Sequence, residues 1–473
     1  MSYLYLSAAH KSSGKTTISV GLTAALKKRG LKVQTFKKGP DYIDPLWLQE
    51  ASSQPCYNLD FNTQSHDEIK AMFTCHMAGP DIGLIEGNKG LYDGVALDGS
   101  DSNAALAQYL KAPVVLVIDV MGITRGIAPL LIGYEAFAPE LTIAGVIFNK
   151  VASSRHESKL RASVEHYTDM AVVGAVPRNE GLLAPERHLG LIPPKESKEA
   201  SARVDELAAM MDSHLDLELI LKMAQRATLP IDQEDTTSAV ETVQLQIKTQ
   251  MKTVRIGIAR DSAFGFYYAD DLDALKKAGA ELVFFNTLED KVLPAVDGLF
   301  LGGGFPETHL QALEENKRLR ADLKKAAQGG LPIYAECGGL MYLSKSIEWQ
   351  GRRAQMVGFI PGTVTMHKKP QGRGLVRVRE TGAGLWPKPG VGGAYATITA
   401  HEFHYASLQD LPPDTVYAHK VERGYGIDGE SDAIVLNNVQ AGFCHHRTTL
   451  QNKWAVRFVE FVQLCKNRSN GMD

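Results

Sequence analysis

Cysteine is scarce in this sequence, and the few cysteines are far apart. The five residues, Cys56, Cys75, Cys337, Cys444 and Cys465, form no paired short spacings. This pattern argues against both a disulfide framework and a zinc site, and it is typical of proteins in a reducing cytoplasm. We therefore expect a cytoplasmic protein.

Long apolar runs and an excess of one charge are also missing. No run approaches the roughly 18 apolar residues that cross a bilayer. The apolar start, Tyr3–Ser7, is too short for a signal peptide and lacks a basic segment. With 51 Lys and Arg against 54 Asp and Glu, the formal net charge is −3. The sequence therefore gives no reason to expect a membrane or a nucleic acid as partner.

The length and the apolar pattern predict two α/β domains. A chain of 473 residues exceeds the size at which one core usually keeps growing. The pattern lapses in a polar stretch, so we expect a domain over residues 1–229, a linker over 230–252 and a second domain over 253–473.

In each half, short apolar runs alternate with helical stretches. In the first half the expected strands are residues 3–7, 33–36, 82–85, 114–118 and 143–148, with a helix over 16–29. In the second half they are residues 254–259, 282–285, 298–301 and 333–335. Such alternation predicts a mostly parallel sheet flanked by helices, with ligands beyond the carboxyl ends of the strands.

A phosphate-binding loop is predicted directly after the first strand. The segment Ser13-Gly14-Lys15-Thr16-Thr17 lies between that strand and a helix, where backbone N–H groups and an ammonium can surround an anion. Lys15 would reach the terminal phosphates of ATP, and the Thr16 hydroxyl would bind Mg²⁺. Ala9 occupies the place of the usual first glycine. The alternative is a fortuitous Gly-Lys-Thr at a helix start.

Acidic loops follow the next two strands of the first half. One contains Lys38, Asp41, Tyr42 and Asp44, and the other contains Glu86 and Asp93. Carboxylates at neighbouring strand ends suit Mg²⁺ that bridges ATP and an anionic acceptor, and nearby lysines could neutralise charge. The alternative is a pair of solvated turns.

The second half contains a candidate nucleophile. Cys337 follows an apolar strand and precedes Gly338-Gly339, as in a tight turn that lifts a nucleophile above a sheet. Gly303 and Gly304 end another strand, so their N–H groups could form an oxyanion hole with that of Gly338. A base is still required, and the sequence offers four histidines for it: His401, His404, His445 and His446. The alternative is a buried, inert thiol.

Together these motifs resemble the cobyrinic acid a,c-diamide synthase family over nearly the whole chain. The matching segments are residues 13–17, 38–44, 86–94, 145–151, 187–191, 302–307, 335–340 and 401–405. The resemblance implies a P-loop NTPase-like, dethiobiotin-synthetase-like ATP domain joined to a flavodoxin-like class I glutamine amidotransferase domain. It further implies ATP-dependent amidation of tetrapyrrole carboxylates with nitrogen from L-glutamine.

The resemblance also assigns roles to residues. Cys337 would form a glutamyl thioester and His445 would activate it. Thr16, Asp44 and Glu86 would hold Mg²⁺. The His-Pro-Glu of most class I amidotransferases is missing after His445, which leaves its orienting partner unassigned. The remaining candidates for a base or an orienting group are His446, Glu402 and His404.

Several alternatives stay open at this point. Tyr92 stands where corrinoid enzymes commonly carry phenylalanine, which favours relatives that amidate sirohaem or a nickel-sirohydrochlorin. Other functional classes are a P-loop regulatory ATPase with an inactive amidotransferase domain and a pigment-binding carrier. A homodimer is one possible assembly.

Overall fold

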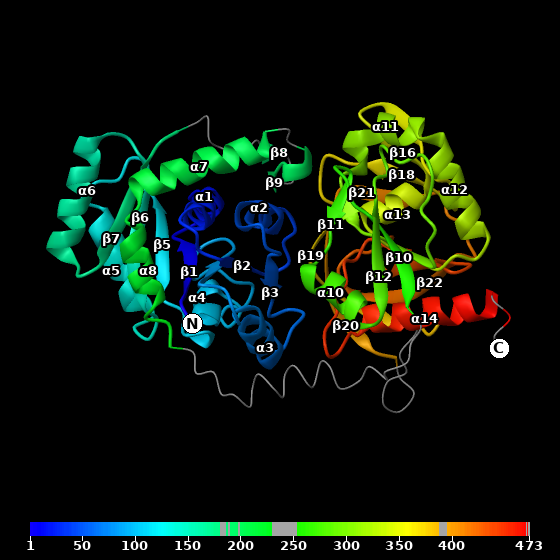
Figure 1. The fold of residues 1–473 in the computed structure, drawn as a ribbon, viewed down its shortest axis with the longest axis horizontal. Coiled ribbons are helices and arrows are strands. Elements are labelled where there is room, and N and C mark those ends of the chain that lie inside the picture. The colour runs from blue at the N-terminus through cyan, green and yellow to red at the C-terminus, as the bar shows by residue number, and fades with distance from the viewer. Residues whose placement is uncertain are drawn as a thin grey trace. The chain divides into compact units, whose positions relative to one another are not determined.

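The computed structural model describes residues 1–179, 186–187, 190–196, 199–228, 253–386, 395–469 and 471 (Figure 1). The chain divides into two compact units, Met1–Leu245 and Gln246–Asp473. The expected linker over 230–252 lies outside the described residues, as do His188 and Leu189 of one quoted motif.

The first unit is built on a parallel sheet. Its strands are β1 (Tyr3–Ala8), β2 (Val33–Lys38), β3 (Tyr57–Leu59), β4 (Ile82–Glu86), β5 (Val114–Asp119), β6 (Ile143–Val151) and β7 (Ala171–Pro177). They run in the order β3-β2-β4-β1-β5-β6-β7, and every pairing is parallel. The predicted α/β sheet of the first half is confirmed.

Helices cover this sheet. They are α1 (Lys15–Lys28), α2 (Ile43–Ser52), α3 (His66–His76), α4 (Asn103–Tyr109), α5 (Ile127–Phe137), α6 (Ser154–Tyr167), α7 (Ala200–His214) and α8 (Leu217–Ala224). The short strands β8 (Glu186–Arg187) and β9 (Gly190–Leu191) form a separate pair. Helices α1 and α7 bury apolar residues in one core, where Gly21 permits close approach because an added Cβ would lie 2.8 Å from the Leu207 carbonyl.

The second unit has a larger, mixed sheet. Its strands are β10 (Val254–Ala259), β12 (Ala280–Phe285), β13 (Gly298–Leu301), β15 (Ile333–Glu336), β19 (Gly372–Glu380), β20 (Thr397–His404), β22 (Val416–Arg423), β23 (Ser431–Leu436) and β24 (Val439–Gly442). Their order is β12-β10-β13-β15-β24-β23-β22-β19-β20. Pairing is parallel from β12 to β24 and antiparallel from β24 to β20. The parallel part matches the expectation, and the antiparallel extension adds strands that the sequence pattern did not predict.

Smaller elements complete this unit. A second sheet contains β16 (Ser344–Trp349), β17 (Arg352–Gln355), β18 (Ile360–Met366) and β21 (Ala406–Gln409), and β11 (Phe264–Phe266) pairs with β14 (Gly303–Gly304). The helices are α10 (Ala269–Lys277), α11 (Leu310–Glu315), α12 (Lys317–Gln328), α13 (Gly338–Leu343) and α14 (Trp454–Ser469). Within the described part of the chain, no helix combines the length and the apolar character needed to cross a membrane.

None of the five cysteines forms a disulfide. Cys56 and Cys444 are buried, and burial raises the pKa of both thiols, as expected for packing residues. The sequence context of the four cysteines other than Cys337 predicts packing residues, but the Cys75 side chain is exposed.

Candidate active sites

The phosphate loop connects β1 to α1 and is clamped from β6. Gly14 has φ 82°, a left-handed conformation that favours glycine. The Asn149 side-chain amide donates to the Ser13 carbonyl oxygen at 2.8 Å, and a Cβ on Gly14 would lie 2.1 Å from that amide nitrogen. Ser13 is buried, Thr17 lies half-buried in the first turn of α1, and Ala9 continues the β1 pairing by donating to the Val117 carbonyl. The loop is therefore formed despite the missing first glycine.

The predicted metal-binding residues converge at this loop. The Thr16 hydroxyl donates to Glu86 Oε1 at 2.9 Å and to Asp44 Oδ2 at 3.3 Å. Lys15 Nζ lies 3.7 Å from Glu86 Oε1. The structure thus brings side chains from α1, α2 and the end of β4 to one point. The reason is that β1 and β2, which precede these helices, end at the same edge of the sheet as β4.

Lys37, at the end of β2, lies at the centre of this group. Its Nζ is 2.5 Å from Asp44 Oδ2, 2.7 Å from Glu86 Oε1 and 3.3 Å from the Gly87 carbonyl oxygen. Its side chain is 1% exposed. Lys37 is one of the nearby lysines expected to neutralise charge, but its position between the two carboxylates was not predicted.

Charge pairing shifts the pKa values of this cluster. Burial alone would lower the pKa of Lys37, but Asp44 and Glu86 outweigh it and raise that pKa well above its usual value. Burial would raise the pKa of Asp44, but Lys37 and Lys15 lower it. Burial, together with Lys37, lowers the pKa of Lys15. These opposite shifts favour the charged forms of Lys37 and Asp44, which form an ion pair.

The remaining residues of the acidic loops make further contacts, and Asp41 Oδ2 lies 3.7 Å from Lys37 Nζ. Asp41 Oδ1 accepts from the backbone N–H groups of residues 43 and 44, next to Tyr42 at the N-terminus of α2. Lys38 Nζ donates to the Asp101 carbonyl oxygen at 2.5 Å, and Asp93 Oδ2 accepts from the Gly90 N–H at 3.0 Å.

Oxygen ligands suitable for Mg²⁺ are present in the cluster. Thr16 offers a hydroxyl, and Asp44 and Glu86 offer carboxylates, the oxygen donors that this ion prefers. Glu86 Oε2 is buried and has no hydrogen-bond partner among the described residues. The donor set therefore fits the ion.

In the second unit, Cys337 occupies a strained turn between β15 and α13. Its φ of 46° and ψ of −102° are unusual for a residue with a Cβ, as in nucleophile elbows. The Cys337 N–H donates to the Gly442 carbonyl oxygen at 2.7 Å. An added Cβ on Gly339 would lie 2.1 Å from the Leu301 carbonyl oxygen, so the turn requires glycine there.

The glycines of the predicted oxyanion hole lie around this turn. A Cβ on Gly338 would lie 3.0 Å from the Gly304 nitrogen, and a Cβ on Gly303 would lie 2.7 Å from His445 Cε1. Gly304 itself could not carry a side chain, because its Cβ would lie 2.0 Å from the Ala263 carbonyl oxygen. The structure therefore brings these backbone segments together beside Cys337 and His445.

His445 lies between Cys337 and Glu336. Its Nδ1 is 3.5 Å from Glu336 Oε2, and its ring interacts electrostatically with Cys337. Burial alone would lower the pKa of His445, but Cys337 and Glu336 outweigh it and raise that pKa to about 10. The other carboxylate oxygen, Glu336 Oε1, accepts from the Tyr334 hydroxyl at 2.7 Å and from the His446 N–H at 2.9 Å. Glu336 was not among the predicted site residues.

His401 packs against His445 from the neighbouring strand. The two residues exchange backbone hydrogen bonds, and their rings stack with centroids 4.9 Å apart. Nδ1 of His401 is 3.2 Å from the Tyr268 hydroxyl. Burial, together with His445, lowers the pKa of His401 well below its usual value, so it lies beside the reactive pair as a neutral ring.

His404 and Glu402 contact each other and β-sheet neighbours. His404 stacks on Phe443 with centroids 4.1 Å apart, and its Nε2 lies 3.6 Å from Glu402 Oε2. The Glu402 carboxylate accepts from the N–H groups of Tyr425 and Gly426. These contacts fix the turn after β22.

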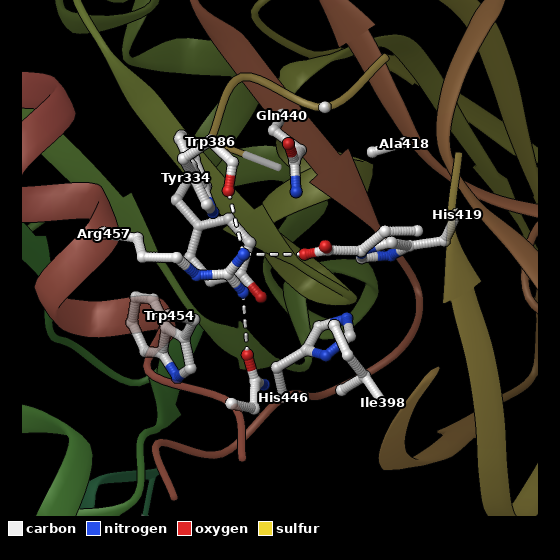
Figure 2. A pocket seen from close by; sticks show the side chains of 12 residues that line it. Tyr334, Trp386, Ile398, Ala418, His419, Gln440, His446, Trp454 and Arg457 are labelled. Carbon is white, nitrogen blue, oxygen red and sulfur yellow. Dashed lines mark hydrogen bonds and ion pairs between the residues drawn. The ribbon is translucent and has the colours of Figure 1, made fainter. Parts of the chain in front are cut away.

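The His446 ring faces a cavity together with His419 and Arg457 (Figure 2). Neither ring nitrogen of His446 has a partner among the described residues. Burial, together with Arg457, lowers the pKa of His446 to about 3.

By distance, His419, Asp432 and His446 could hold a metal ion, since their ligand atoms lie within 4.8 Å of one another. However, the Asp432 carboxylate already accepts from the N–H groups of residues 443 and 444, and the Arg457 guanidinium lines the same cavity. Positive charge at this cavity disfavours a second cation.

Comparison with known proteins matches both halves of the chain. Residues 8–192 match the CobQ/CobB/MinD/ParA nucleotide binding domain, and residues 255–453 match the CobB/CobQ-like glutamine amidotransferase domain. A cobyrinate a,c-diamide synthase of Magnetococcus marinus is 43% identical over 97% of this chain and 96% of its own. Proteins with the same name from Archaeoglobus fulgidus, 40% identical over 94% of both chains, and Listeria innocua, 38% identical over 94% and 96%, are also similar. The chain therefore belongs to the cobyrinate a,c-diamide synthase family.

Proposed function

We propose that this protein is a glutamine-dependent, ATP-hydrolysing cobyrinate a,c-diamide synthase. It converts peripheral acetate carboxylates of the macrocycle to amides. The observation that supports this most is the presence, in one chain, of a charged phosphate-loop cluster and of a cysteine in a strained turn that interacts with a histidine. Relatives with this name match nearly the whole chain.

The second unit supplies the ammonia in this proposal. The Cys337 thiolate attacks the side-chain amide carbon of glutamine, and the N–H groups of Gly304 and Gly338 stabilise the oxyanion. His445, as imidazolium, donates a proton to the departing ammonia. Water, deprotonated by His445, then attacks the thioester, which releases glutamate and regenerates Cys337.

The first unit activates the acceptor. A carboxylate is unreactive toward ammonia until one of its oxygens becomes a good leaving group, so it attacks the γ-phosphate of ATP and ADP leaves. Ammonia then attacks the acyl phosphate, loses a proton, and displaces phosphate. Lys15 and Lys37 stabilise the charge on the transferring group. Mg²⁺, held by Thr16, Asp44 and Glu86, would neutralise phosphate charge.

Replacing the nucleophile tests the division of labour. Cys337→Ser is expected to abolish glutamine-driven synthesis and to leave synthesis from free ammonium intact. Cys75→Ser, which changes an exposed cysteine of the first unit, serves as the matched control and should affect neither reaction. Loss of both reactions in Cys337→Ser would contradict the proposal. A wild-type protein that hydrolyses ATP but never glutamine would indicate the regulatory ATPase instead.

The acceptor is tested with a panel of macrocycles. The enzyme would be incubated with ATP, glutamine and, in turn, cobyrinate, hydrogenobyrinate, sirohaem and nickel-sirohydrochlorin. Mass spectrometry then counts replacements of a carboxyl OH by NH₂. We expect two replacements on cobyrinate, and amidation of sirohaem alone would overturn the choice of a corrin. Sedimentation of the same preparation would tell whether the protein is a homodimer.

A further inference from the structure

A histidine that shuttles protons needs a partner at its second ring nitrogen. The partner fixes the ring orientation and the tautomer, and it stabilises the imidazolium that forms during the reaction. Downstream of His445 the chain continues with His446 and Arg447. Neither of these side chains carries a carboxylate that could hold His445. Arg447 donates to Asp270, and the ring of His446 faces a cavity.

The structure provides a carboxylate from the residue before the nucleophile. Glu336 ends β15, is 2% exposed, and places Oε2 3.5 Å from His445 Nδ1. Adjacent residues of a regular strand point to opposite faces. Here the chain leaves the strand at Cys337, whose φ is 46°. The turn therefore lets two successive side chains contact the same imidazole.

The carboxylate of Glu336 is itself held in place. Its Oε1 accepts from the Tyr334 hydroxyl and from the His446 backbone N–H, at 2.7 and 2.9 Å. Two donors on one oxygen leave the other oxygen directed at His445. Tyr334 is packed among the rings of Phe300, Trp454 and Phe458, so its hydroxyl is positioned by the core.

Other buried carboxylates of this unit are engaged elsewhere. Asp271 accepts from the Thr448 N–H and the Trp454 ring N–H. Asp432 accepts from backbone N–H groups at residues 443 and 444, and Glu402 from those at 425 and 426. None of these contacts involves His445.

We propose that Glu336 is the positioning residue of His445, in place of the carboxylate that most class I amidotransferases carry after the histidine. It holds Nδ1, so the other ring nitrogen faces Cys337, and its carboxylate provides the counter-charge of the imidazolium that forms during the reaction. The role in turnover rests on the proposed glutaminase reaction.

Glu336→Gln is the sharpest test. The glutamine oxygen can still accept from Tyr334 and His446, so the local packing is preserved. Its NH₂ group then faces His445 Nδ1. The N–H at Nδ1 cannot accept a hydrogen bond from this group, and the imidazolium loses its counter-charge. Glu380→Gln is the matched control, because Glu380 is another buried glutamate of this unit, paired with Arg457.

We expect kcat for glutamine hydrolysis in Glu336→Gln to fall on the order of 100-fold while KM for glutamine changes about 2-fold or less. The basic limb of the pH profile of kcat/KM should move to lower pH by about one unit or more, because the imidazolium loses its counter-charge. Glu336→Asp restores the charge and should return the basic limb toward that of the wild type. Synthesis from free ammonium should be unchanged in each variant.

The rate at which iodoacetamide alkylates Cys337, followed by mass spectrometry of its peptide, tests the same contact without turnover. At mildly acidic pH the wild-type rate should exceed that of Glu336→Gln several-fold. A wild type without glutaminase activity would defeat the proposed function, and this alkylation difference would still support Glu336. Conversely, wild-type kcat, pH profile and alkylation in Glu336→Gln, with glutaminase intact, would overturn the role of Glu336 alone.

Discussion

The two candidate sites differ in how their charges are satisfied. In the first unit, Lys37 binds the carboxylates of Asp44 and Glu86, yet Glu86 Oε2 has no partner among the described residues. In the second unit, Cys337, His445 and Glu336 already contact one another. One site is a set of ion pairs that ATP and its metal would rearrange, and the other is preorganised without its substrate.

This difference follows from the chemistry of each half. Phosphoryl transfer brings its own charges, so the protein needs exchangeable partners for phosphate and metal. Thioester formation starts from a neutral amide, so the protein must supply the thiolate, the proton and the oxyanion donors. The comparison predicts that the halves can be inactivated separately.

Lys37→Met should produce the largest separation. Removing the ammonium from between the carboxylates of Asp44 and Glu86 leaves them to repel each other, and it removes a charge that stabilises the transferring phosphoryl group in the proposed reaction. We expect synthesis from either glutamine or ammonium to fall about 1,000-fold, in line with the loss of a key electrostatic contact. Glutamine hydrolysis measured without acceptor should stay close to wild type.

Lys28→Met is the control for this experiment. Lys28 lies in the same unit and pairs with Asp205 on the surface, where both side chains are more than half exposed. Surface pairs contribute little, so synthesis should be unaffected. Equal losses of glutaminase and synthetase activity in Lys37→Met would show that the two halves cannot be inactivated separately.

Much of the first site could be predicted from the sequence, and the central lysine could not. Lys15, Thr16, Asp44 and Glu86 converge because each follows or begins an element at one sheet edge. The neighbouring lysines at the end of β2, Lys37 and Lys38, are both buried. Sequence alone did not tell which of them faces the carboxylates, because that depends on the orientation of the strand end.

The second site shows a different limit. The sequence indicated Cys337, His445 and the glycine turns, whose local chemistry is distinctive. It did not indicate Glu336, and the candidates for an orienting group were His446, Glu402 and His404 instead. The strained φ of Cys337 brings adjacent side chains to one ring, and strand alternation does not predict that. The antiparallel strands β19, β20, β22 and β23 were not predicted, although β19 alternates valine and arginine over residues 376–379.

Replacing each of the two adjacent histidines with glutamine tests which of them takes part in glutamine hydrolysis. His445→Gln should lower glutaminase activity about 1,000-fold, because the proton donor is lost. His446→Gln should change kcat about 3-fold or less, because that ring faces the cavity with His419 and Arg457 (Figure 2). Steady-state glutaminase assays on both variants measure this. A loss in His446→Gln as large as that in His445→Gln would place the second imidazole in the reaction.

The smallest effect is expected on stability in acid. In the second unit this stability depends on the protonation of His446. Burial, together with Arg457, lowers the pKa of His446 to about 3, whereas an unfolded histidine titrates near about 6.5. The unfolded state therefore binds this proton first as pH falls. The stability that the neutral ring provides is complete above about pH 6.5 and is lost progressively between about pH 6.5 and 3, by up to about 1.4 kcal/mol per pH unit.

His446→Gln removes this titration, so its melting temperature should fall less than that of the wild type between about pH 7 and pH 5. Differential scanning calorimetry of the full chain measures the difference. His367→Gln, at a half-buried histidine of the same unit that contacts Ser407, is the control and should keep the wild-type slope. Because glutamine cannot titrate, a slope in His446→Gln as steep as in the wild type would mean that other groups, such as the carboxylates paired with Lys37, dominate acid unfolding.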